Sequence, residues 1–168
     1  MAENTDATAQ QNDDTKPQFA LQRIYVKDIS FESPNAPAIF QQTWQPKVSM
    51  DLNSSYTKIS DTQYEVVVSL SITAKIEEKV AYIVEVQQAG VVMIKNIEDA
   101  QLGHMLGAYC PNLLFPYARE TVDGMVNRGS FPSLMLAPVN FDLVYQQSLQ
   151  RKQQEQAEQG AAEEKQPH

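Results

Sequence analysis

The order in which two hydrophobic periods occur along the chain constrains its fold more than any other feature. In the first half, apolar residues alternate with polar ones, which is the period of a strand. In the second half they recur every three or four residues, which is the period of a helix. Because all strands precede all helices and the strand connections are short, the pattern predicts an α+β fold. We expect a four-stranded antiparallel sheet with helices packed on one face, and the other face open to solvent or to a partner.

Four segments carry the alternation of a strand. They are Phe19–Glu32, Val48–Tyr56, Tyr64–Lys75 and Val80–Gln88, and Gly90 is expected to end the last one. In the first strand, strict alternation predicts two different faces. One face carries Phe19, Leu21, Tyr25, Ile29 and Phe31, and the other carries Ile24, Val26, Asp28 and Glu32.

The helical period defines three further segments. The first helix is expected to be capped by Asn96 and to end near Gly107, and the third to run from Val139 to about Gln153. Between them, a long helix over residues 112–127 is closed by Gly129, and residues 130–137 are extended. Residues 1–18 and 151–168 are polar, so we expect disordered tails around a single domain at 19–150.

The composition of the chain indicates which kinds of partner it can bind and in which compartment it works. The chain has 168 residues and a net charge of −8, which excludes nucleic acid as the expected partner and favours a basic or amphipathic protein. Its single cysteine, Cys110, cannot form an intramolecular disulfide and fits a reducing compartment. The N-terminus is not a secretory signal, and no apolar run approaches the roughly 20 residues that span a bilayer. We therefore expect a cytoplasmic protein that does not insert into the membrane.

The sequence offers little for catalysis or for binding a cofactor. His104 and Cys110 could form a base and a nucleophile, but a helix histidine and a buried cysteine explain them more simply. They also fall short of the three or four ligands of a metal site. The glycines do not have the spacing of a phosphate-binding loop. We therefore expect neither an enzyme, a cofactor nor a metal.

Two surfaces remain as candidates for binding. The face of the sheet that the helices leave open is expected to carry Asp28, Glu32, Ile83 and Glu85. It is either a solvated face or a docking surface for a basic partner. A surplus of apolar residues forms either core and oligomer interface or a groove that accepts unfolded chains. These residues are Trp44, Val48, Met50, Leu52, Tyr56, Phe131, Leu134, Met135, Leu136 and Phe141.

Several blocks of the sequence resemble the bacterial protein-export chaperone family SecB. They are IYVKDISFESPNAP, TWQP, YEVVVSLSITA, GAYCPNLLFPYARE, RGSFP and LAPVNFD. The likeness covers residues 19–149, and the blocks at 107–120 and 131–142 are the most specific.

The resemblance implies a function and a set of partners. Members hold non-native precursor proteins in the cytoplasm without ATP, and pass them to the SecA motor of the translocon. They are homotetramers built as a dimer of dimers. By position, Asp28, Glu32, Ile83 and Glu85 would contact the basic, zinc-binding C-terminal tail of SecA, whose zinc belongs to the partner. The inward residues Val84, Val86 and Gln88 would influence tetramer assembly. A structural protein that uses its apolar surface only in a permanent oligomer stays open as the alternative.

Overall fold

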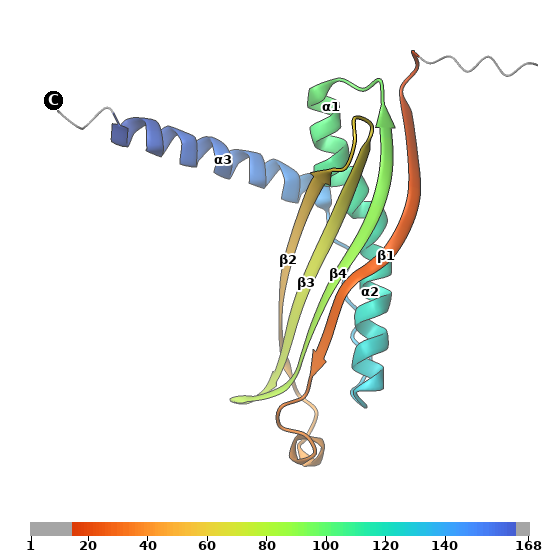
Figure 1. Cartoon of the computed structure of the whole chain (residues 1–168). Coiled ribbons are helices and arrows are strands. Elements are labelled where there is room, and N and C mark those ends of the chain that lie inside the picture. The colour runs from red at the N-terminus through yellow and green to blue at the C-terminus, as the bar shows by residue number, and fades with distance from the viewer. Residues whose placement is uncertain (1–14, 164–168) are drawn as a thin grey trace, which may run out of the picture.

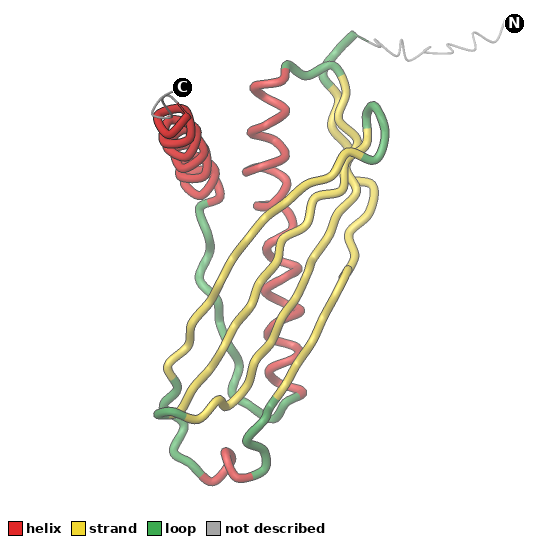
Figure 2. Tube along the Cα trace, turned by 60° about the vertical axis from the view of Figure 1, so that its left-hand side comes forward, coloured by secondary structure: helices red, strands yellow, loops and turns green. Residues whose placement is uncertain are grey.

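The computed structural model describes the backbone of residues 15–163 and the side chains as far as Gln154. Four antiparallel strands form one sheet in the order β1-β4-β3-β2. The strands are β1 (Gln18–Glu32), β2 (Lys47–Lys58), β3 (Gln63–Ile76) and β4 (Lys79–Lys95), and a 3-10 turn, η1 (Ala38–Gln41), lies between β1 and β2. The helical elements are α1 (Asp99–His104), η2 (Met105–Tyr109), α2 (Cys110–Arg128) and α3 (Phe141–Glu163). Helix α2 covers one face of the sheet, so the predicted α+β class is confirmed (Figures 1 and 2).

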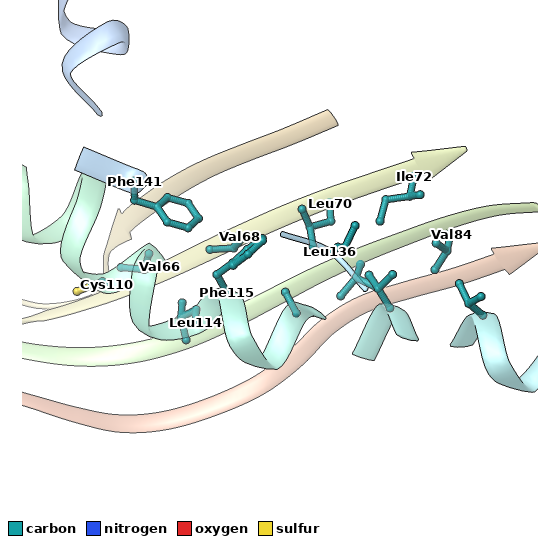
Figure 3. Packing of buried hydrophobic residues seen from close by; sticks show 14 of the residues in the cluster. Val66, Val68, Leu70, Ile72, Val84, Cys110, Leu114, Phe115, Leu136 and Phe141 are labelled. Atoms are coloured by element: carbon teal, nitrogen blue, oxygen red, sulfur yellow. The ribbon is translucent and has the colours of Figure 1, made fainter. Parts of the chain in front are cut away.

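The core lies between α2 and the two central strands. Alternate residues of β3 and β4 point to the helix side, and β3 contributes Val66, Val68 and Leu70 at 2% exposure or less. They meet Leu114 and Phe115 of α2 (Figure 3). Full burial of each such side chain stabilises the fold by about 1.5–3 kcal/mol. This contact fixes which face of the sheet is inner, toward α2, and which is outer.

Strand β1 departs from strict alternation at two bulges. Its register with β4 shifts between Leu21 and Arg23 and again between Val26 and Asp28. Each extra residue reverses the facing of those that follow it. The predicted facing of residues 23–26 is therefore wrong: Ile24 and Val26 belong to the inner face and Tyr25 to the outer face. After the second bulge the predicted facing returns.

Strand β4 does not end at Gly90, as the sequence pattern suggested, but continues to Lys95. Gly90 instead leaves space for α2 to pack on the sheet. A Cβ built there would lie 2.8 Å from Leu114 Cδ2, which is closer than side chains tolerate. Gly90 therefore allows α2 to approach the sheet closely.

The predicted break at Gly107 is also wrong, because α1, η2 and α2 follow one another without a gap from Asp99 to Arg128. The segment Met105–Tyr109 is a π-helical turn, in which the N–H of Cys110 bonds the carbonyl of Met105. Pro111 follows at once and has no N–H to donate, so the wider turn adjusts the ladder just ahead of it. Asn96 does not cap the helix. Its backbone is left-handed, with φ of 56°, and Glu98 occupies the N-cap position.

The extended segment after α2 was predicted, and it is fastened to the helix. The N–H of Leu134 donates to Asp123 Oδ1 at 2.9 Å. Helix α3 then begins at Phe141, capped by Asn140 Oδ1, which accepts from the N–H of Leu143 at 3.1 Å. It continues to Glu163 and projects from the sheet (Figure 1). The prediction of a disordered tail is therefore wrong for residues 151–163, while residues 1–14 and 164–168 lie outside the described part. No helix within residues 15–163 is long and apolar enough to cross a bilayer.

Candidate binding surfaces

The four residues predicted for partner docking lie together on the outer face. Pairing of β1 with β4 sets Asp28 opposite Gln87 and Glu32 opposite Ile83. Glu85 lies between these two pairs, opposite Ser30. We call Asp28, Glu32, Ile83 and Glu85 the acidic face. None of the helices covers it in the described structure (Figure 2).

Hydroxyl groups orient Glu85 at the centre of the acidic face. Ser71 Oγ of β3 donates to its Oε1 at 3.2 Å, and Ser30 Oγ of β1 donates to its Oε2 at 3.5 Å. A shallow hollow of about 270 Å³ adjoins it, bordered by Asp28 and Asp51. Sequence reasoning missed Asp51 of β2 as a neighbour of Glu85. The strand order needed to see this comes from the tertiary fold.

A second polar cluster crosses the outer face beside the acidic face. Lys27 Nζ of β1 lies 2.7 Å from Glu65 Oε2 of β3. The hydroxyl of Tyr25 donates to the other carboxylate oxygen of Glu65. These two contacts, with Lys27 the stronger cause, hold the pKa of Glu65 below its usual value. The same carboxylate raises the pKa of Tyr25. Ala89 of β4, opposite Tyr25, is fully buried.

The three residues predicted to influence assembly point to the inner face and are buried. Val84 and Val86 are 0% and 1% exposed, and Gln88 is 3% exposed. The amide of Gln88 donates to the carbonyl of Tyr25 at 2.9 Å, and its oxygen accepts from Thr121 Oγ1 of α2 at 3.4 Å. These contacts lie within one protomer, and the role of the three residues in assembly stays a prediction.

On the inner side of edge strand β2, an apolar strip lies beyond the cover of α2. Val48, Met50 and Leu52 pair with Ala74, Ile72 and Leu70 of β3, which are buried on the inner face. Val48 and Met50 are nevertheless 42% and 40% exposed, and Tyr56 is 54% exposed. We call Val48, Met50, Leu52 and Tyr56 the apolar strip. Exposed apolar side chains gathered along one strand are typical of a binding surface.

Trp44 and Phe131 meet at one end of the molecule, in an aromatic cluster completed by Phe31, Phe40 and Tyr82. The ring centroids of Trp44 and Phe131 are 5.4 Å apart, and those of Tyr82 and Phe131 are 5.0 Å apart. Phe131 is buried, whereas Trp44 is half-buried and Phe40 is 49% exposed. Sequence reasoning missed Phe40, which stands next to the prolines of the β1–β2 connection.

At the other end of the apolar strip, a hollow of about 260 Å³ lies between β2 and the root of α3. Leu52, Tyr56 and Phe141 line it together with Leu106 and Val144. Phe141 is 2% exposed and meets the ring of Phe115 edge-on at 5.5 Å. It therefore belongs to the core and closes the base of the hollow.

The remaining predicted groove residues lie on the extended segment. Leu136 is 9% exposed and joins the core, Leu134 is half-buried against it, and Met135 is 82% exposed. Leu134, Met135 and Leu136 also line a hollow of about 220 Å³ against α2. The predicted groove residues thus fall into a buried set, which shapes the surface, and an exposed set, which can touch a ligand.

His104 and Cys110 have different surroundings and form no nucleophile–base pair. His104 Nε2 lies 2.7 Å from Asp142 Oδ1, and its ring meets that of Tyr145 edge-on at 5.7 Å. Cys110 is 1% exposed, and burial raises the pKa of its thiol to about 12. The thiol is therefore protonated at neutral pH. Among the described side chains, no three His, Cys, Asp or Glu residues come together as metal ligands would.

Comparison with known proteins places the chain in a family. A family model described as preprotein translocase subunit SecB matches residues 12–152. The protein-export protein SecB of Marinobacter nauticus is 66% identical over 168 residues, which covers 100% of both chains. That of Hahella chejuensis is 57% identical and covers 94% of this chain and 95% of its own. Among solved structures, a SecB-like chaperone of Mycobacterium tuberculosis, in complex with an antitoxin peptide, has a TM-score of 0.62 at 13% identity. The match covers 72% of this chain and 90% of that one, and shows a shared fold.

Proposed function

Because this chain belongs to the SecB family and is a chaperone of protein export, we propose that the two faces of its sheet bind different partners. The inner side of β2 binds non-native precursor proteins, and the acidic face docks the SecA motor that receives them. The observation that carries this proposal is the register of the strands. It places four predicted docking residues on the outer face and leaves the apolar strip of β2 uncovered on the inner side.

The apolar strip suits an extended, unfolded chain. Its side chains recur at every second residue over Val48, Met50 and Leu52, which matches the side-chain period of an extended ligand. Met50 is flexible and adapts to ligands of different shape. The strip lies between the aromatic cluster at one end and the hollow at the root of α3 at the other. A precursor can therefore be held by many weak apolar contacts.

The backbone of β2 adds contacts that do not depend on ligand sequence. β2 is the last strand in the sheet order, so within the described structure its other edge pairs with no strand. Such an edge can hydrogen-bond an added extended segment. Binding of this kind favours chains that fold slowly, because a fast-folding chain hides its backbone and apolar residues first.

The acidic face suits the basic tail of SecA. Asp28, Glu32 and Glu85 supply negative charge in a region centred on Glu85, and Ile83 adds an apolar contact among them. Complementary charge speeds encounter and fixes orientation. SecA brings its own ATPase, so transfer of the precursor needs no nucleotide on the chaperone.

The proposed working form is a cytoplasmic homotetramer, a dimer of dimers. Several apolar strips on one tetramer can hold one long precursor. Their combined affinity then exceeds the affinity of each site.

The client side is tested with a slowly folding secretory precursor diluted from urea. Tyr56→Ser and Met50→Ser should each weaken capture about tenfold, because each removes an apolar contact of about 1.5 kcal/mol. Ile59→Ser is the matched control, since Ile59 is also exposed, at 55%, but follows the end of β2. Equal capture by the strip variants and by Ile59→Ser would place the client elsewhere.

The docking side is tested by calorimetry with the zinc-loaded C-terminal tail of SecA as a peptide. Glu85→Gln should weaken binding about two- to fivefold, the value of an exposed ion pair. Glu78→Gln removes the same charge in the exposed turn between β3 and β4, and should have little effect. If both variants lost affinity equally, net charge rather than the acidic face would attract the tail.

A further inference from the structure

We infer that Lys27, the bulged residue of β1, is a positioning residue for the acidic face: its contact with Glu65 holds Asp28 and Glu32 toward the docking partner. The inference rests on the proposed docking of a basic partner at this face. Lys27 is itself a cation and would repel such a partner. Its contribution to docking therefore has to come from geometry. Charge and geometry then predict opposite changes in the affinity for the partner when Lys27 is replaced.

The outward facing of Asp28 depends on the second bulge of β1. Val26 pairs with Gln88 on the inner face, and Asp28 pairs with Gln87 on the outer face, so Lys27 is the additional residue between them. If this bulge were lost with the preceding register kept, the following residues would reverse their facing. Ile29 and Phe31 would turn outward, and Asp28 and Glu32 would turn toward the apolar core side.

Contacts on both faces of the sheet hold the bulge. On the outer face, Glu65 of β3 binds Lys27 Nζ at 2.7 Å and also accepts from the Tyr25 hydroxyl. Charge-assisted bonds of this kind are stronger than neutral ones. On the inner face, the Gln88 amide donates to the carbonyl of Tyr25 at 2.9 Å, and Thr121 Oγ1 of α2, which also donates to the carbonyl of Tyr117, lies 3.4 Å from the Gln88 oxygen.

The contact of Lys27 crosses β4 and links two strands that are not neighbours in the sheet. Glu65 belongs to β3, so the Lys27–Glu65 pair spans β4 and ties β1 to a strand with which it shares no ladder. The outer segment of β1 that carries Asp28, Ser30 and Glu32 begins directly after this tie. Release of Lys27 frees the start of that segment, while its pairing with β4 still allows the protein to fold.

Charge and positioning predict opposite effects for Lys27→Met. By charge alone, removal of a cation next to Asp28 makes the face more negative, and a basic peptide binds more tightly. By positioning, the bulge loosens, the carboxylates lose their orientation, and the peptide binds more weakly. The expected loss is about threefold to tenfold, which lies within the range seen for residues that act on a site without contact.

The test uses the full-length protein and the zinc-loaded SecA tail peptide at low ionic strength. Lys27→Met should weaken binding, and Lys27→Arg, which keeps the charge and a donor for Glu65, should bind as the wild type does. Lys58→Met is the matched control, because Lys58 is an exposed lysine paired with Asp61 at 3.6 Å and belongs to β2, at the opposite edge of the sheet from β1. It should leave affinity unchanged. Lys27→Met binding with equal or higher affinity than the wild type would overturn the inference.

Two further measurements distinguish positioning of the acidic face by Lys27 from a general role of Lys27 in folding. Capture of unfolded precursor should be unchanged in Lys27→Met, and amide exchange should rise within residues 28–32. If Lys27→Met does not fold, Gln88→Met reports on the same bulge from the inner face without any change of charge; unchanged peptide affinity in that variant, with its oligomeric mass intact, would also refute the inference. Glu85→Gln distinguishes the two proposals. If Glu85→Gln binds normally, docking is not at this face; if it binds weakly while Lys27→Met does not, only the positioning role fails.

Discussion

Gly124 and Gly129 lie near the end of α2 but are glycine for different reasons. A Cβ at Gly124 would meet no atom within 4 Å. A Cβ at Gly129 would overlap the ring of Phe31, which packs with Tyr82 and Phe131 in the aromatic cluster. Gly129 has an ordinary φ of −73°, and Ser130 takes the left-handed conformation instead. Gly129 therefore provides space for an aromatic ring, whereas Gly124 weakens the helix without visible benefit.

Alanine at these two positions should change stability in opposite directions. Gly124→Ala should raise the free energy of unfolding by about 0.5–1 kcal/mol, because alanine is the better helix former. Gly129→Ala should lower it by about 1–3 kcal/mol, because the Phe31 ring has to move. Urea titration of both variants measures this. A stabilising Gly129→Ala would mean that the aromatic cluster has room which the structure does not show.

Glu65 makes stability depend on pH. Its pKa is lowered in the folded state, chiefly by Lys27 and then by Tyr25, relative to a usual value of 4.5. The stabilisation is therefore fully present above pH 4.5 and is lost as the pH falls through the lowered folded value. Glu65→Gln should be less stable than the wild type at pH 7, and the difference should shrink below pH 4.5. A difference that stays constant from pH 7 to pH 3 would contradict this account.

Among the elements, α3 is attached to the body at its root. Tyr145 lies across Gly103 and Gly107, Phe141 is buried, and Asp142 meets His104. A side chain at Gly107 would overlap the Tyr145 ring. Gly107 therefore belongs to the docking of α3 rather than to a helix end. The root of α3 also lines the hollow beside the apolar strip, so its attachment shapes that end of the proposed client surface.

The packing of Tyr145 on Gly107 predicts a non-additive pair of substitutions. Gly107→Ala should displace the ring and raise amide exchange in the first turns of α3, and Tyr145→Ala should do the same by removing the ring. Once the ring is absent, Gly107→Ala should add little. Hydrogen exchange of the two single variants and the double variant measures this. Fully additive effects would show that the two residues act separately.

For the whole molecule, the sheet separates two surfaces of different physical character. In the proposed function, the acidic face binds through charge, and the apolar strip binds through burial of nonpolar area. The two surfaces should therefore respond differently to salt. Raising the salt concentration from 0.05 to 0.5 M shortens the Debye length from roughly 14 Å to about 4 Å and screens exposed charges.

Binding of the SecA tail should fall steeply over this range, whereas capture of an unfolded precursor should stay level or strengthen. Calorimetry for the tail and suppression of precursor aggregation measure the two responses. Equal sensitivity of both would mean that clients are held mainly by charge.

Much of the fold follows from the order of periods in the sequence. Strands before helices determined the α+β class, and alternation in β4 placed Ile83 and Glu85 outward and Val84, Val86 and Gln88 inward, as the structure has them. The outward facing of Asp28 and Glu32 was also predicted, although the alternation behind it failed between the two bulges. It succeeded because two reversals cancel.

The remaining features could not be predicted from the sequence, because the responsible contacts join residues far apart in the chain. Glu65 and Gln88 hold the bulge at Lys27. Position 107 has to be glycine because the Tyr145 ring packs there, and position 90 because Leu114 does. Local sequence patterns predict that such glycines end a strand or a helix, whereas here they leave space for a side chain that packs against them. The sequence alone determined which residues alternate and which carry charge. The pairing of strands decided which of them face the same side.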